Sequence, residues 1–419
     1  PLLFYPEIYY DFKVTGAGTQ NANPVSGDMR WVPVYWSQSP EPEENGIFRL
    51  WKIGTAKGVY TDKKLTFNLY VFFQKEMYDG TEWKITDTVE SVRYQFSAAP
   101  LLKETASGYL SGGLYYKVSG KKEVCVTGCT ADMSAVQIPS AVNINGTSYK
   151  VTSVGAKAFS GNKKIIGVTL GDNVAYIDKQ AFYQCEKLQT ITLPSALTQI
   201  GDEAFSGCLV LDKIKIPSEV TTIGKSAFEN CAAAESISMG NLVDTIGDLA
   251  FKGCTRASSV KISSALTEIP KELFAGDTSF TDCKIPNSVT AINASAFEGC
   301  TGLTTITIPS SVTTIETSAF SGCTGLTDLS FKSGVTVIGD SAFQGCTGLK
   351  SVTLPSSVVS IGTSAFSGCT ALAEVSIPKA TMSIKSAAFS GCTFTTVTIN
   401  KVCSYQSDSF PTGIKIENY

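Results

Sequence analysis

The sequence predicts a mainly β protein in which a small N-terminal β-sandwich precedes a long solenoid of stacked repeats. The first observation is a spacing of 23 residues that recurs without insertion or deletion from Phe159 to Cys392. The second is that residues 1–105 carry no trace of this spacing, although they hold all four tryptophans of the chain. A short fixed period is typical of a solenoid, because each repeat buries its apolar residues only against its neighbours.

Two residue types mark the period most clearly. A phenylalanine recurs eleven times, and it follows alanine in every copy except the one with Leu273. Three positions later a cysteine stands in nine copies, whereas Asn162 and Asp277 fill the same position in the other two. The phenylalanines are Phe159, Phe182, Phe205, Phe228, Phe251, Phe274, Phe297, Phe320, Phe343, Phe366 and Phe389. The cysteines are Cys185, Cys208, Cys231, Cys254, Cys300, Cys323, Cys346, Cys369 and Cys392.

A single unit contains the signals for a strand followed by a turn. One copy reads Leu303-x-x-Ile306-x-Ile308-Pro309-x-x-Val312-x-x-Ile315-x-x-x-Ala319-Phe320-x-Gly322-Cys323. The alternating apolar residues at its start predict a short strand, and proline ends the strand because it cannot donate to a ladder. The Ala-Phe-x-Gly-Cys stretch predicts a short helical or 3-10 turn on the convex side. We therefore expect about eleven coils, on the order of 50 Å in length at a strand spacing of roughly 4.8 Å.

The composition divides the chain into four parts. Residues 1–105 form the predicted β-sandwich, because β-branched and aromatic stretches alternate there with polar turns. Residues 106–158 would cap the solenoid with strands and a hairpin at Asn143–Val151, residues 159–399 form the repeat array, and residues 400–419 form an irregular last coil. The strands expected in the first part are Ile8–Val14, Arg30–Trp36, Ile47–Ile53, Leu65–Phe73, Glu82–Thr86 and Ser91–Phe96.

The composition also excludes several classes of function. The chain contains no histidine, which removes Ser-His-Asp and Cys-His catalysis and histidine-ligated zinc. The formal net charge is −3, so a basic nucleic-acid-binding protein is not expected. No apolar run approaches the length of a membrane-spanning helix. We expect no cofactor.

The thirteen cysteines allow two interpretations. Stacked repeats would bring the nine ladder cysteines near disulfide distance, but parallel side chains in a packed ladder more often behave as small buried hydrophobic residues. We therefore expect free buried thiols, with Cys283 and Cys403 as apolar filler. A disulfide between Cys125 and Cys129 remains an open alternative.

Two further sequence patterns resemble active-site motifs. Gly224-Lys225-Ser226 resembles the end of a phosphate-binding loop, but the first glycine of that motif is missing and the stretch simply occupies a repeat position. Glu41, Glu43 and Glu44 could form a carboxylate pair for glycoside hydrolysis, yet in a proline-rich loop we expect solvated charges.

The outward positions of the predicted strands form the candidate ligand-binding concave face. Most are Ser or Thr, and a basic spot interrupts them. The candidate site residues are Lys213, Lys215, Lys261, Lys284, Thr307 and Thr353. Such a face could present hydrogen-bonding groups over a broad surface, as solenoid receptors do. The alternative, which we weigh equally, is that Ser and Thr merely suit an exposed strand.

The repeat resembles the leucine-rich repeats of the BspA-like family of bacterial and protozoan cell-surface proteins. The likeness covers about Gly108 to Phe410 and rests on the period, on the Ile308–Val312 and Ile361–Phe366 steps and on the Gly-Cys pair. It implies surface display, binding to host or neighbouring-cell proteins, and no enzymatic activity.

The leading hypothesis is a cell-surface or secreted, non-enzymatic, adhesin-like protein that binds a protein partner through its solenoid. The partner would be a host or neighbouring-cell surface or extracellular-matrix protein, an acidic one included, and the chain would be a monomer. The alternative is a glycan-binding or glycan-scavenging component that acts through the N-terminal aromatic residues. The export signal and the anchor are expected to lie outside this chain, which opens on Pro1.

Overall fold

The protein consists of two compact units, Pro1–Lys103 with Ile144–Thr147, and Glu104–Asn143 with Ser148–Tyr419. The computed structural model describes residues 29–37, 59–61, 64–79, 81–98, 104–131 and 133–419. Each unit is described by itself below.

The first unit contains one antiparallel sheet built around a long central strand. Its strands are β1 (Met29–Ser37), β2 (Val59–Thr61), β3 (Lys64–Tyr78) and β4 (Trp83–Ala98). Strand β3 pairs with all three others.

The prediction of a β-sandwich is wrong for the described part of this unit, which contains a single sheet. The segments 82–86 and 91–96, predicted as two strands, belong almost entirely to the one strand β4, because a bulge against β3 absorbs the polar residues between them. Predicted strands at 8–14 and 47–53 lie outside the described residues.

The second unit opens with an antiparallel meander and a hairpin. The meander consists of β5 (Glu104–Thr105), β6 (Gly108–Ser111), β7 (Leu114–Gly120) and β8 (Glu123–Cys129). The hairpin of β10 (Ala141–Ile144) and β11 (Thr147–Val154) turns at Asn145-Gly146, where both residues have positive φ. Asn-Gly favours this tight turn because both residues tolerate the left-handed region. Strand β11 then pairs in parallel with β8, which starts the solenoid.

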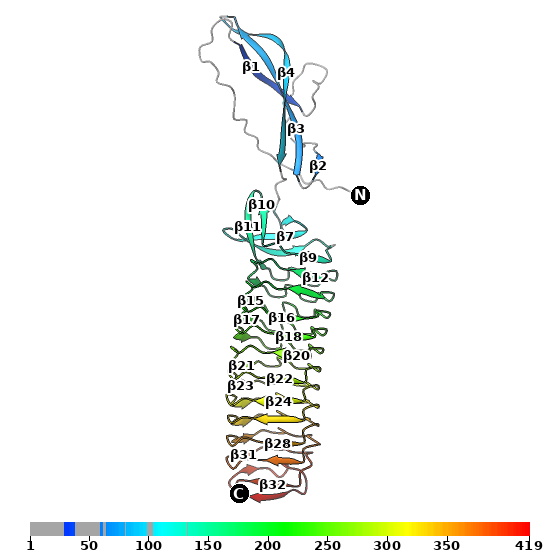
Figure 1. Cartoon of the computed structure of the whole chain (residues 1–419), viewed down its shortest axis with the longest axis vertical. Helices are drawn as coiled ribbons and strands as arrows, with labels where there is room; N and C mark the ends of the chain where they lie inside the picture. The colour runs from blue at the N-terminus through cyan, green and yellow to red at the C-terminus, as the bar shows by residue number, and fades with distance from the viewer. Residues whose placement is uncertain (1–28, 38–58, 62–63, 80, 99–103, 132) are drawn as a thin grey trace. The chain divides into compact units, whose positions relative to one another are not determined.

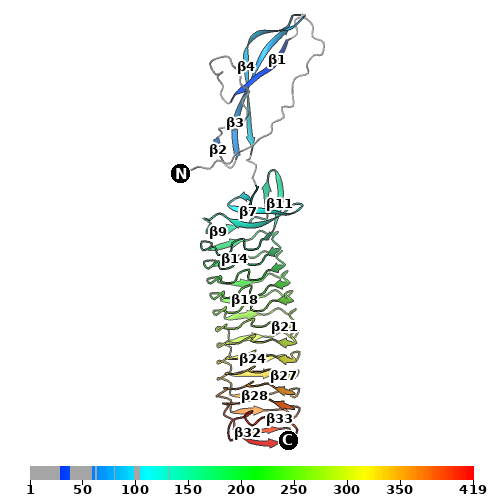
Figure 2. The same ribbon diagram turned by 180° about the vertical axis from the view of Figure 1, so that it is seen from behind.

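The solenoid carries two columns of short parallel strands on its two sides (Figure 1, Figure 2). The first column has thirteen strands in residues 133–419: β9 (Ala135–Gln137), β12 (Gly167–Thr169), β14 (Thr190–Thr192), β16 (Ile214–Lys215), β18 (Ser236–Ser238), β20 (Ser259–Lys261), β22 (Asp282–Lys284), β24 (Thr305–Ile308), β26 (Asp328–Phe331), β28 (Ser351–Thr353), β30 (Glu374–Ser376), β32 (Thr396–Ile399) and β34 (Lys415–Asn418). The second column continues from β11 with β13 (Tyr176–Ile177), β15 (Gln199–Ile200), β17 (Thr222–Ile223), β19 (Thr245–Ile246), β21 (Glu268–Ile269), β23 (Ala291–Ile292), β25 (Thr314–Ile315), β27 (Val337–Ile338), β29 (Ser360–Ile361), β31 (Ser383–Ile384) and β33 (Ser404–Tyr405).

The second column was not predicted, because two residues of strand are too few to produce an alternating pattern. The number of coils is also larger than expected. The cap contributes a strand to the first column at its N-terminal end, and the last coil keeps both columns through β33 and β34.

A ladder of stacked phenylalanine rings fills the core between the two columns. From Phe159 to Phe389 the rings of successive coils stack, and Phe410 continues the ladder with its centroid 5.7 Å from that of Phe389. Phe320 lies 5.0 Å from Phe297 and 5.2 Å from Phe343, and all three rings are fully buried. Each ring therefore buries its faces against the rings of adjacent coils, which a single repeat could not do.

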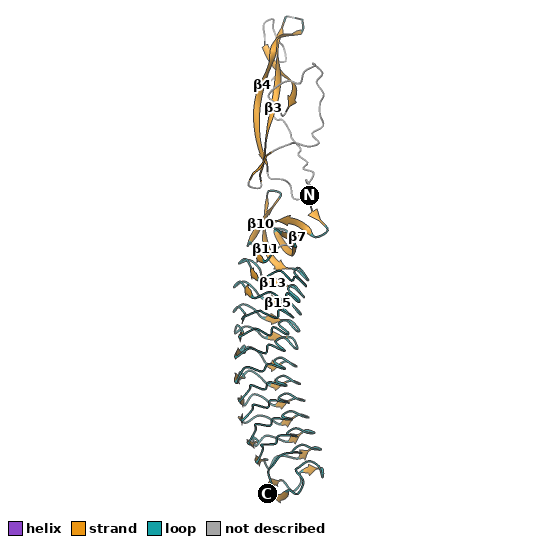
Figure 3. Cartoon of the chain, turned by 90° about the vertical axis from the view of Figure 1, so that its right-hand side faces the viewer, coloured by secondary structure: helices purple, strands orange, loops and turns teal. Residues whose placement is uncertain are grey.

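The Ala-Phe-x-Gly-Cys stretch is not helical, contrary to the prediction (Figure 3). Every second N–H group of this turn donates to the next coil instead of to its own. Those of Ser318, Phe320 and Gly322 donate to carbonyls of the next coil over 2.7–2.9 Å, whereas those of Ala319 and Cys323 donate within the turn. A helix would need every N–H group for its own carbonyls.

Two left-handed residues per coil accompany this arrangement. In the coil of Phe320 they are Ser318 (φ 57°) and Gly322 (φ 72°). Glycine adopts this region without steric cost, but the first of the two positions holds a residue with a Cβ in every coil from Lys157 to Ala387. The array therefore contains a repeated backbone strain.

We predict that Ser318→Gly raises the free energy of unfolding by up to about 1 kcal/mol, because it removes the Cβ strain at positive φ. Ser321→Gly is the matched control: Ser321 lies in the same turn but has negative φ, so this change should lower stability by about 0.5–1 kcal/mol. Urea unfolding of both variants measures the difference. An equal loss of stability in both would contradict the strain argument.

Candidate binding surface

The outward residues of the first strand column form one continuous face, which we call the first-column face. Strand pairing places Lys215 beside Ser238 and Ser238 beside Lys261, and it places Lys284 beside Thr307. Thr353 lies in the same row and Lys213 two residues before Lys215, so all six predicted site residues lie on this face. Their side chains are exposed.

The four candidate lysines of this face are free of ion pairs. No carboxylate lies within ion-pair distance of Lys213, Lys215, Lys261 or Lys284 among the described residues. Lys215 and Lys261 are two coils apart, which corresponds to roughly 10 Å. An array gains no stability from like charges at this spacing.

The face also carries acidic residues that the sequence analysis did not single out. Asp282 precedes Lys284 by two residues on the same strand, and Asp328 and Glu374 occupy the equivalent position two and four coils further on. All three are exposed. The unpaired basic residues therefore lie in the coils from Lys213 to Lys284. Asp328 and Glu374 make the following coils acidic, and the last strand of the face, β34, carries Lys415 paired with Glu417. The repeat alignment of the outward positions would have revealed this asymmetry.

The hydroxyl groups of the array divide into two kinds. Beside the strands, Thr304, Thr313 and Thr336 each donate to a backbone carbonyl of the preceding coil over 2.9–3.3 Å. These hydroxyls serve the fold. In contrast, the side-chain hydroxyls of Thr307 and Thr353 form no hydrogen bond within the described part of the chain, and both side chains are exposed.

The cysteine ladder has a structural role beyond filling space. Each of the nine thiols donates to the carbonyl oxygen of the phenylalanine one coil earlier, at Sγ–O distances of 3.1–3.5 Å. The carbonyl of Phe320, for example, accepts the N–H of Cys323 and the S–H of Cys346. Both lone pairs of that oxygen are thereby used in a core that water does not reach.

All thirteen cysteines are free thiols, as expected for the eleven that lie in the array. Burial raises the pKa of the Cys323 thiol to about 12, so the reactive thiolate is suppressed. The disulfide between Cys125 and Cys129 does not form: both lie on strand β8, and four extended residues separate their Cα atoms by roughly 13 Å.

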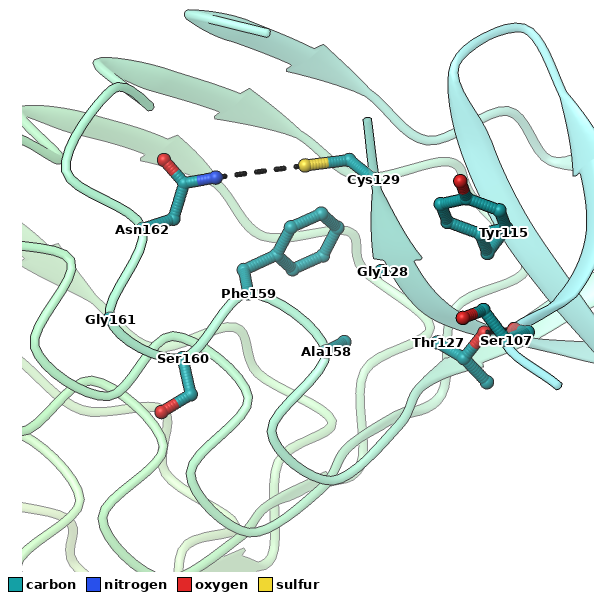
Figure 4. A pocket seen from close by; sticks show the side chains of 10 residues that line it. All are labelled: Ser107, Tyr115, Thr127, Gly128, Cys129, Ala158, Phe159, Ser160, Gly161 and Asn162. Carbon is teal, nitrogen blue, oxygen red and sulfur yellow. Dashed lines mark hydrogen bonds between the residues drawn. The ribbon is translucent and has the colours of Figure 1, made fainter. Parts of the chain in front are cut away.

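A shallow pocket of about 330 Å³ lies at the N-terminal end of the phenylalanine ladder (Figure 4). Here Asn162 occupies the cysteine position, and its amide donates to the Cys129 sulfur over 3.7 Å. The lining residues are Ser107, Tyr115, Thr127, Gly128, Cys129, Ala158, Phe159, Ser160, Gly161 and Asn162. None of them carries a charged side chain, so the pocket offers no acid–base pair.

Two other features are absent from the described ranges. No cluster of three or more Cys, Asp or Glu side chains there is arranged to hold a metal ion. These residues also contain no apolar helix of membrane-spanning length.

The repeat matches a known family over most of the chain. The BspA type leucine rich repeat region matches residues 152–279, 221–350 and 290–417. The chain belongs to the BspA-type leucine-rich repeat family. This membership accounts for the 23-residue period and for the solenoid.

Several solved structures, most of them named as leucine-rich repeat or leucine rich proteins, are similar to this chain. A leucine-rich repeat protein from Bacteroides ovatus ATCC 8483 is 26% identical, with a TM-score of 0.41; the match covers 74% of this chain and 99% of that one. A leucine rich cell surface protein from Faecalibacterium prausnitzii A2-165 is 25% identical (TM-score 0.38, coverage 75% and 95%). The pneumococcal vaccine antigen PcpA is 19% identical (TM-score 0.48, coverage 75% and 94%). No curated protein matches the chain.

We predict that the native protein hides its ladder thiols from a thiol reagent. Without reductant, the denatured protein should react at all thirteen cysteines, whereas in the native protein Cys125 and Cys129, which are half-buried, should react much faster than the buried ladder thiols. Peptide mass mapping after labelling measures this. Loss of labelling in the denatured, unreduced protein would show that disulfides had formed.

Proposed function

We propose that this BspA-type protein is a non-enzymatic, surface-displayed or secreted binding protein, and that the first-column face is its recognition surface. The observation that carries the proposal is the row of unpaired lysines and free threonine hydroxyls on an exposed sheet. Surface groups that serve the fold are paired in this protein, as the Thr304 and Thr313 hydroxyls are. The four candidate lysines and the Thr307 and Thr353 hydroxyls of the first-column face are not paired.

The chemistry of the face indicates the partner. Lys213, Lys215, Lys261 and Lys284 present positive charge over four coils, and the neighbouring Ser and Thr residues can donate and accept hydrogen bonds. A macromolecule with spaced acidic groups, such as an acidic extracellular protein, would complement this part of the face. Such a partner explains like charges at a spacing that folding does not require.

The absence of an acid–base constellation in the described residues agrees with a binding role. The chain has no histidine, and the pocket at the end of the ladder has no charged lining. Glycan binding through the N-terminal aromatic residues stays a prediction: Trp31, Trp36 and Trp83 lie on β1 and β4, but the structure describes only the backbone there, and Trp51 lies outside the described residues.

We predict that replacing Lys215, Lys261 and Lys284 together by Thr weakens binding to an acidic matrix partner and flattens its salt dependence. The melting temperature should stay unchanged or rise slightly, because only like-charge repulsion is lost. The partner is first identified by pull-down from extracellular matrix, and affinity is then measured at low and high salt.

The matched control replaces three exposed lysines away from this face, Lys187, Lys225 and Lys401, by Thr. It changes the net charge equally and should leave affinity unchanged. If both triple variants bind with wild-type affinity and salt response, the first-column face is not the recognition surface.

A further inference from the structure

The array contains one junction at which both strand columns are interrupted. In the second column β19 and β21 belong to different sheets, and in the first column β20 and β22 do too. Elsewhere in residues 133–419, a break in one column is bridged by pairing in the other. The coil of Phe251 and the coil of Phe274 therefore meet without any strand hydrogen bonds. We call this junction the seam.

The sequence explains the interruption in the second column. In other coils the residue after the strand donates its N–H to the preceding coil: Gly224 donates to Ile200 and Gly247 to Ile223, both over 2.8 Å. Pro270 occupies this position at the seam and has no N–H to donate.

The contacts of the phenylalanine ladder are stretched across the seam, whereas Ser279 Oγ still donates to the Thr255 carbonyl across it over 2.6 Å. The Phe251 and Phe274 ring centroids are 6.0 Å apart, whereas all other successive rings of the ladder are 5.0–5.7 Å apart. The Phe251 N–H donates to the Leu273 carbonyl over 3.1 Å, compared with 2.7 Å for Phe320. An ion pair of Lys252 with Glu272, at 2.6 Å, spans the seam at the surface.

The seam also lacks its thiol. Asp277 occupies the cysteine position of this coil. Among the ladder phenylalanines from Phe159 to Phe366, Phe251 is therefore the one whose carbonyl accepts no hydrogen bond from a thiol. The Asp277 side chain is fully buried, and neither of its carboxyl oxygens has a hydrogen-bond partner. The nearby N–H groups of Gly253 and Cys254 already donate to Ala275 and Phe251.

No cation compensates the buried carboxyl. The titratable groups nearest it are the thiols of Cys254 on one side and Cys300 on the other, both neutral. Lys252, Glu272 and Glu298 belong to the adjoining turns, but Lys252 is engaged by Glu272 at the surface. Burial accordingly raises the pKa of Asp277 well above its usual range.

We propose that the seam is a proton-controlled opening point of the solenoid, and that Asp277 controls it. In the closed state Asp277 carries a proton, so the side chain that takes the place of the missing thiol is uncharged. When the proton leaves, an unpaired charge remains in an apolar core, and hydration of that charge separates the blocks before and after the seam.

The direction of the pH dependence follows from proton linkage. Asp277 binds its proton more tightly in the closed state than in the open state, so closure is favoured fully at acidic pH. It weakens as the pH rises from the normal aspartate range toward the raised pKa of Asp277. Across that interval, the opening equilibrium constant should increase up to tenfold per pH unit.

The test compares the wild type with Asp277→Cys, which restores the residue of the other ladder positions, and with Asp277→Asn, which keeps a donor but cannot ionise. Native protein is labelled with a thiol reagent at a series of pH values, and labelling of Cys254 and Cys300 is followed by peptide mass mapping. Comparison at equal pH cancels the intrinsic pH dependence of thiol reactivity.

We expect the wild-type to variant ratio of labelling rates at Cys254 and Cys300 to rise with pH by about tenfold per unit, with no such rise at Cys346. In urea unfolding, the wild type should become progressively less stable than the two variants as the pH rises. A ratio that is constant with pH, or an Asp277→Asn variant that keeps the wild-type pH dependence, would overturn the proposal.

Discussion

The hydrogen bonds that alternate N–H groups of each turn donate to the next coil are the constraint on which the rest of the structure depends. The N–H groups of Phe320 and Gly322 find their acceptors in Ala342 and Gln344, each 22 residues further on. An insertion or deletion shifts such a donor relative to its acceptor unless the loop between them absorbs it, as in the shorter last coil, where Phe389 donates to Ser409. The uniform period, the stacked rings and the aligned outward rows all follow from this requirement. The Phe–Cys pairing depends on it too, because the thiol reaches a carbonyl 26 residues earlier only when coils are equal in length.

The sequence predicted the solenoid, its core and the alignment of the six candidate residues because these depend on period alone. It did not predict the second strand column or the non-helical turn. A two-residue strand such as β25 carries no alternating pattern, and Ala-Phe-x-Gly-Cys is compatible with a helical turn until the destinations of its N–H groups are known. The β-sandwich was predicted from composition, which indicates strands but not how many sheets they form.

A comparison of equivalent positions in successive coils distinguishes residues that the fold requires from residues that it only accommodates. Thiols and Thr hydroxyls recur where they satisfy backbone carbonyls, as Cys346 and Thr313 do. Lys215, Lys261 and Lys284 recur on the first-column face without a partner, which is why they support a binding role. Asp277 and Pro270 depart from the pattern in the core itself, and together they concentrate the weakness of the array at one junction.

The most direct test of this account is native-state amide hydrogen exchange resolved to single residues. If the inter-coil bonds hold the array together, the amides of Phe320 and Gly322 should exchange among the slowest in the chain. Those of Leu249, Phe251 and Gly253, which donate across the seam, should exchange clearly faster despite equal burial of the Phe side chains. Uniform protection along the ladder would contradict the seam, and rapid exchange at Phe320 would contradict the central role of the inter-coil bonds.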